Sequence, residues 1–172
     1  MKPTTQTSIF PEHQGNSTNS KTEQVAPIII YIDGASRGNP GPSGVGVWLS
    51  SNNKDILHTN GFLGIKTNNQ AEYLALALAL FHLKKIANKE QNRVIIRSDS
   101  LLLVKQMRGE YAIKNPFIKA LAPLIATLKM GFTCTFQHVP REKNSIADAE
   151  ANKGIDNRAE LPVEFKKLIS HY

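Results

Sequence analysis

Short apolar runs in the first third of the chain predict three strands. Residues 28–32 (IIIYI) form a β-branched run typical of a strand that is buried on both faces. Residues 44–50 alternate small and apolar side chains, and residues 55–64 follow an Asn-Asn turn signal, so each predicts a further strand. Residues 34–43 are rich in Gly and Pro and predict a loop. Three strands with short links favour an antiparallel meander.

The rest of the pattern alternates helices with two more strands. Residues 68–89 are rich in Ala, Leu and Glu and predict the clearest helix, with Asn68 or Asn69 as its cap. Residues 93–98 and 132–139 predict strands. Further helices are predicted over residues 99–108, 116–130, 145–153 and 162–169, with a kink or break at Pro123 and stops at Gly109 and Gly154. The order βββαβααβα predicts an α/β fold, a mixed sheet with helices on its faces.

Residues 1–26 show no such periodicity. They are rich in Thr, Ser, Asn and Gln and predict a disordered tail in front of one folded domain, residues 27–172. The tail lacks the apolar stretch of a secretory signal, and no apolar run approaches the roughly 20 residues that span a bilayer. Gln6 to Phe10 (QTSIF) resembles the short peptide by which bacterial replication proteins dock on the sliding clamp, which makes the clamp a candidate partner.

Composition and charge narrow the class of protein. With 172 residues, 41% of them hydrophobic, the chain can build a core without a metal or a disulfide. The single cysteine, Cys134, excludes a disulfide framework and favours a reducing, cytoplasmic compartment. The net charge is +7, and the tail contributes none of it because its two lysines balance its two glutamates. We expect the domain to be a monomer. Its basic charge suggests nucleic acid as the first candidate partner and an anionic membrane surface as the second. The alternative is a basic surface that only aids solubility.

Four acidic residues fall where this topology would bring ligands together. Asp33 and Asp99 stand at the exits of the first and fourth strands, Glu72 in the first turn of the long helix, and Asp148 near the start of a late helix. The carboxyl ends of strands are where α/β sheets usually bind ligands. Taken singly, each residue has an ordinary alternative as a helix-dipole partner, a turn residue or a cap.

Together, the four carboxylates predict a metal centre. Like charges at short range repel, so the cluster needs cations to stay ionised. Hard oxygen ligands select Mg²⁺, with Mn²⁺ as a possible substitute. Two such ions roughly 3.5–4 Å apart form a clamp for in-line phosphoryl displacement, in which one activates water and the other stabilises the leaving oxygen. Basic charge around an acidic metal site suits a nucleic-acid hydrolase.

Four blocks of sequence around these residues resemble type 1 ribonuclease H. They are YIDGASRGNPGP from Tyr31, TNNQAEY from Thr67, SDS from Ser98, and HVPREKN from His138 followed by Ala147-Asp148. The match runs over residues 28–156, and the four blocks in order make it specific. The resemblance implies a ribonuclease H-like sheet of three antiparallel strands then two parallel ones, flanked by helices. It also implies an endoribonuclease that hydrolyses the RNA strand of RNA–DNA hybrids with two metal ions, leaving 5′-phosphate and 3′-hydroxyl ends.

The resemblance also assigns roles to individual residues. The metal ligands, which are the catalytic residues, would be Asp33, Glu72, Asp99 and Asp148. Hybrid-binding roles would fall to residues of the first loop and of the start of the long helix: Gly34, Ser36, Asn39, Thr67, Asn68 and Asn69. Glycine at position 34 would let the backbone approach a sugar 2′-hydroxyl, and helix capping is the alternative for the two adjacent asparagines.

Three departures from the family pattern keep alternatives open. Leu101 stands where the family often has Gln, so Gln106 is a candidate for part of that contact. Many bacterial members of the family carry a basic insertion between the middle helices that grips the hybrid. The corresponding segment here is short, which would lower the affinity for the hybrid or make that affinity more salt-dependent. Many members have a flexible histidine loop before the last aspartate that helps proton transfer and product release. This loop is short here, so His138 is a candidate for a catalytic role, and Arg141 is an alternative candidate that would contact the scissile region. The alternative function is a non-catalytic module of the same fold that binds hybrids or double-stranded RNA; a strand-transfer enzyme would need additional domains.

Overall fold

A five-stranded mixed sheet forms the centre of the computed structural model, which describes residues 25–87 and 92–172. The spatial order is β3-β2-β1-β4-β5; β1, β2 and β3 pair antiparallel, whereas β1–β4 and β4–β5 are parallel. The strands are β1 (Ile28–Ser36), β2 (Gly41–Ser51), β3 (Lys54–Lys66), β4 (Arg93–Ser98) and β5 (Thr133–His138). The predicted α/β fold is thus confirmed, whereas the predictions for the tail up to residue 24, including Gln6 to Phe10, lie outside the described residues.

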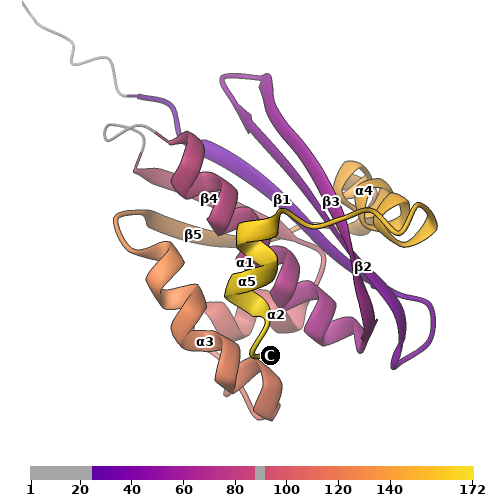
Figure 1. Cartoon of the computed structure of the whole chain (residues 1–172). Helices are drawn as coiled ribbons and strands as arrows, with labels where there is room; N and C mark the ends of the chain where they lie inside the picture. Colours follow the sequence, from indigo (N-terminus) through magenta and orange to yellow (C-terminus); the bar gives the residue numbers. More distant parts are fainter. Residues whose placement is uncertain (1–24, 88–91) are drawn as a thin grey trace, which may run out of the picture.

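Helices cover the two faces of the sheet unequally (Figure 1). They are α1 (Asn68–Ile86), α2 (Leu101–Met107), α3 (Pro116–Lys129), α4 (Ser145–Asp156) and α5 (Val163–Ile169), with a short 3₁₀ helix at Arg141–Lys143. In Figure 1, α4 lies on one side of the sheet and the other helices on the opposite side. The middle of α1 is buried nearly all round because the sheet contacts one side of it while α3 and α5 contact others. No helix within the described ranges is long and apolar enough to cross a membrane.

Glycines bring α1 and α4 close to the sheet. A Cβ at Gly34 would lie 2.1 Å from the backbone nitrogen of Glu72 on α1. On the opposite face, a Cβ at Gly46 would lie 2.0 Å from the carbonyl oxygen of Ala147 on α4. Only residues without side chains permit these distances. The two helices that carry Glu72 and Asp148 are therefore pressed against β1 and β2.

The region predicted as a loop over residues 34–43 is largely strand. The β1–β2 ladder continues to the pair Ser36–Ser43, which leaves only residues 37–40 as the turn. Asp33 accordingly lies inside β1, opposite Gly46, and not at the exit of the strand. Of the glycines that suggested a loop, Gly34 is required by the close approach of α1, whereas Gly38 lies in the turn at positive φ.

The start of α1 also differs from the prediction. Thr67 is the cap: its hydroxyl accepts a hydrogen bond from the Gln70 backbone, and the Gln70 side chain accepts one from the Thr67 backbone. Asn68 and Asn69 are therefore the first residues of the helix and not its cap. Glu72 follows in the second turn, so the helix-dipole explanation does not apply to it.

Three further predictions about the helices differ from the structure: the start of α2, the effect of Pro123 on α3 and the end of α4. Helix α2 begins after Ser100, whose side chain caps it, so Asp99 belongs to the preceding turn. Pro123 neither breaks nor splits α3, because it lies on the exposed side where water can satisfy the unpaired carbonyl. Gly154 lies inside α4 and does not end it; a Cβ there would be 2.7 Å from the carbonyl oxygen of Gly61 on β3.

Candidate active site

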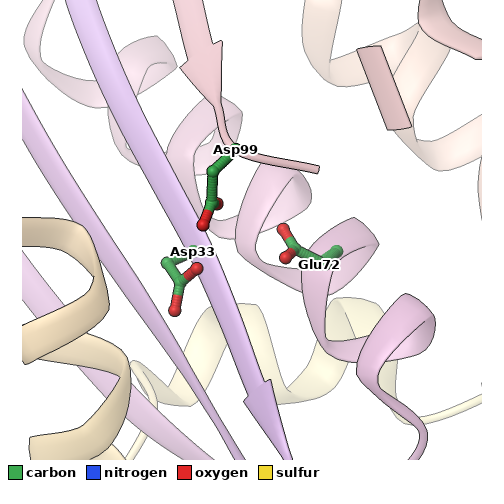
Figure 2. Close-up of side chains that lie close together, drawn as sticks. All are labelled: Asp33, Glu72 and Asp99. Carbon is green, nitrogen blue, oxygen red and sulfur yellow. The ribbon is translucent and has the colours of Figure 1, made fainter. Parts of the chain in front are cut away.

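Three carboxylates converge where β1 runs past the carboxyl end of β4 (Figure 2). Asp33 projects from β1, Asp99 directly follows β4, and Glu72 reaches in from α1. The parallel register pairs Tyr31 with Arg97, so Asp33 and Asp99, each two residues further on, come level with one another. One carboxylate oxygen from each of the three lies within 4.8 Å of the others.

Burial and the repulsion of neighbouring carboxylates raise the pKa of Asp33 and of Glu72. Asp33 is 5% exposed, and burial together with the charges of Asp99 and Asp148 raises its pKa to about 7. Burial, followed by the charges of Asp33 and Asp99, raises the pKa of Glu72 well above its usual value. The buried Oε2 of Glu72 has no hydrogen-bond partner among the described residues. An unpartnered carboxylate oxygen in a group of hard donors fits a divalent cation.

Asp148 lines the same hollow but stands apart from the closest three carboxylates. It lies in the first turn of α4, as predicted, with its side chain 25% exposed. Arg141 Nη2 donates to its Oδ1 at 2.7 Å, and Asn152 Nδ2 donates to its Oδ2 at 3.2 Å. The hollow measures about 260 Å³ and is lined by all four predicted carboxylates. The fold therefore brings all four acids to one place, three of them in close proximity.

Asn144 is a site residue that the sequence did not reveal. It is fully buried, and its Nδ2 donates to the carbonyl oxygen of Ile32 at 2.9 Å and to Asp99 Oδ1 at 3.0 Å. It ties the orientation of Asp99 to the backbone of β1. Its position just before α4 suggests a helix cap, yet its side chain makes no capping bond there. Only the tertiary structure distinguishes these two uses of an asparagine.

The residues predicted to bind the hybrid surround the turn at residues 37–40 and the start of α1. Asn68 and Asn69 are exposed, and Asn39 Oδ1 accepts a hydrogen bond from the Asn68 backbone at 3.1 Å. The Ser36 hydroxyl donates to the carbonyl oxygen of Lys66 at 2.9 Å, and Thr67 caps the helix, so both side chains also hold this corner together. Gly34 is buried against α1.

A second, larger hollow of about 520 Å³ opens beside Asn69. Gln106 lines it and fixes its shape: Gln106 Oε1 accepts from the Tyr73 hydroxyl at 2.9 Å, and Nε2 donates to the carbonyl oxygen of Ala112 at 3.0 Å. Gln106 thereby fastens the α2–α3 loop to α1. The walls of this larger hollow also include Leu102, Tyr111, Lys114 and Ile118.

His138 and Arg141, the two candidates from the segment of the short histidine loop, take different places. His138 ends β5, is exposed, and its Nε2 lies 3.2 Å from the backbone carbonyl oxygen of Asp99. Arg141 lines the carboxylate hollow, whereas His138 is not among the residues that line it. The geometry therefore favours Arg141 as the residue closer to the chemistry.

Comparison with known proteins gives one consistent family. The reverse transcriptase-like family model matches residues 31–154. Ribonuclease HI of Halobacterium salinarum is 38% identical over 151 residues, which cover 84% of this chain and 74% of that protein. Its crystal structure gives a TM-score of 0.71 at 37% identity, over 76% of this chain and 98% of that one. The crystal structure of LC11-RNase H1 in complex with an RNA/DNA hybrid gives 0.70 at 41% identity, over 76% and 97%. The chain belongs to the type 1 ribonuclease H family.

Proposed function

We propose that the chain is an endoribonuclease that hydrolyses the RNA strand of RNA–DNA hybrids with the help of divalent cations. The observation that carries the proposal is the group of three carboxylates from Asp33, Glu72 and Asp99, of which Asp33 and Glu72 are buried and Glu72 has an oxygen without a hydrogen-bond partner among the described residues. It is supported by the likeness to LC11-RNase H1, which was crystallised with an RNA/DNA hybrid. The basic charge of the chain suits a polyanionic substrate.

The positions of the side chains support a division of labour among the four carboxylates. Asp33, Glu72 and Asp99 would hold one cation, and Asp33 and Asp148 a second. Mg²⁺ or Mn²⁺ bound there lowers the pKa of water and neutralises charge on the leaving oxygen. Asn144 keeps Asp99 turned toward the cluster through its 3.0 Å hydrogen bond. Attack on phosphorus with departure of the 3′ oxygen would leave 5′-phosphate and 3′-hydroxyl ends.

The hybrid would lie across the two hollows, which are adjacent through α1. Asn68 lines the carboxylate hollow and Asn69 the larger one, so consecutive residues face both. We infer that the RNA strand lies over the carboxylates and the DNA strand over the larger hollow. Lys105, which packs over the Tyr111 ring at 4.7 Å, and Lys114 supply positive charge there in place of a basic insertion.

Cleavage of an end-labelled RNA–DNA hybrid, with Mg²⁺ and then Mn²⁺, tests the proposal. Single-stranded RNA, duplex RNA and a chelator serve as substrate and metal controls. Asp33→Asn should abolish cleavage while hybrid binding persists; Glu164→Gln, on the exposed surface of α5, is the matched control and should cut normally. Absence of cutting with either metal, with binding retained, would favour the non-catalytic binding module instead. Near wild-type cutting by the Asp33 variant would refute the assigned site.

A further inference from the structure

The short segment between β5 and α4 carries Arg141, whose positive charge lies beside the four proposed catalytic carboxylates. Arg141 begins the 3₁₀ helix between β5 and α4, and its side chain is 76% exposed although its guanidinium reaches Asp148. The other arginine that lines this hollow, Arg37, is paired with Asp156. Arg141 is therefore the arginine that faces the four carboxylates.

The hydrogen bond from Arg141 occupies one of the two carboxylate oxygens of Asp148. Asp148 Oδ1 accepts from Arg141, while Oδ2 accepts from Asn152, which is anchored one turn further along α4. A divalent ion held by Asp148 would compete with the guanidinium for the negative charge of this carboxylate, and the repulsion between the two cations would weaken the 2.7 Å hydrogen bond. An exposed ion pair of this kind contributes little to stability, so its displacement is easy.

A guanidinium released at this position has an obvious second partner. Its planar, forked donors match a phosphate group, and Arg141 would be released beside the place where the scissile strand lies in the proposed function. We propose that Arg141 is a positioning residue that alternates between two partners: it holds Asp148 as an internal counter-cation in the metal-free protein and moves to the backbone phosphate of the hybrid once Asp148 is neutralised by a cation. The inference rests on the proposed function for its second partner only.

The first partner is tested by titration calorimetry with Mn²⁺ and Mg²⁺ alone. Arg141→Ala should bind the ion about three- to fivefold more tightly than wild type, the gain expected from removing an exposed competing pair. Lys143→Ala removes the same charge from the same 3₁₀ helix but not from the hollow, and should change affinity less than twofold. In an Asp148→Asn background, Arg141→Ala should not change the affinity for the ion any further. If Arg141→Ala and Lys143→Ala change the ion affinity of the otherwise wild-type protein equally, the inference is overturned.

The second partner is tested by hybrid binding in a chelator, where no cleavage occurs. Asp148→Asn imitates neutralisation and should free Arg141 for the hybrid. Arg141→Ala should then weaken hybrid binding severalfold in the Asp148→Asn background and leave it nearly unchanged in the wild-type background. Lys143→Ala, which removes a charge from outside the hollow, should have the same small effect on hybrid binding in both backgrounds, and Arg141→Lys should restore part of the loss by retaining the charge. If the effects of the Arg141 and Asp148 substitutions on the free energy of hybrid binding are additive, the proposed exchange of Arg141 between Asp148 and the phosphate is refuted.

The two experiments separate failure of the inference from failure of the proposed function. If the wild-type protein binds no hybrid with or without metal, the proposed function is wrong, and calorimetry still decides whether Arg141 competes for Asp148. If hybrids bind and are cut but the Arg141 effects are additive, the function stands and the exchange does not.

Discussion

Replacing Asp33 with Asn should stabilise the metal-free protein at pH 8 and have little effect at pH 4. The pKa of Asp33 is about 7 in the folded chain, compared with an ordinary value of 3.8, because the side chain is buried beside Asp99 and Asp148. Between pH 3.8 and about pH 7, the folded state therefore binds more protons than the unfolded state. The free energy of unfolding must therefore fall as pH rises across this window. Asparagine keeps the shape of the side chain and removes the charge that causes the fall.

The magnitude follows from the size of the displacement. A pKa that moves from 3.8 to about 7 corresponds to roughly 4 kcal/mol, at about 1.4 kcal/mol for each pH unit. The pKa of Glu72 is raised by burial and then by the charges of Asp33 and Asp99, so the titration of Glu72 is coupled to that of Asp33. We therefore expect Asp33→Asn to gain about 2–4 kcal/mol at pH 8, a large fraction of the roughly 5–15 kcal/mol typical of a whole domain.

The assay is urea unfolding followed by circular dichroism in a chelator at pH 4, 6 and 8. Glu164→Gln provides a control of opposite sign, because its ion pair with Lys85 lowers the pKa of Glu164 and is lost at low pH. Saturating Mg²⁺ should narrow the gap between Asp33→Asn and wild type, since the ion stabilises only the chain that binds it well. An Asp33 variant no more stable than wild type at pH 8, or a gain independent of pH, would refute the reasoning.

Three further substitutions test the parts that support the cluster. Gly34→Ala should destabilise the protein by about 3 kcal/mol or more in the same urea assay, because its Cβ would lie 2.1 Å from the Glu72 nitrogen; a variant of wild-type stability would show that α1 can shift. Asn144→Ala should cost about 1–3 kcal/mol and lower kcat more than it raises KM, because Asp99 loses its buried donor; unchanged kcat would contradict the orienting role. His138→Ala should retain cleavage within about tenfold of wild type, since general acid–base groups contribute about 10²–10⁴; a hundredfold loss would restore His138 as a proton-transfer residue.

Local patterns in the sequence identified the strands of the core and the four acids, but not the contacts that organise them. The run at residues 28–32 predicted the start of β1 because burial of β-branched residues is a local signal. The extension of β1 to Ser36 depends on pairing with β2 and on the close packing of α1 at Gly34, neither of which a window of neighbouring residues contains. For the same reason, Gly154 suggested a helix end although it is a contact point with β3.

The segment between β5 and α4 illustrates how the site combines separate controls. Asn144 orients Asp99 and Arg141 binds Asp148, so a few adjacent residues act on two of the four carboxylates. Apart from Arg141, which would reach the hybrid only after a cation neutralises Asp148, the residues proposed to hold the hybrid lie at the start of α1 and along the α2–α3 loop. Because the two groups belong to different elements, changes between β5 and α4 should alter metal affinity with little effect on hybrid affinity in a chelator. Changes in the α2–α3 loop should do the reverse, so a chimera that exchanges either segment can separate cation binding from substrate binding in one chain.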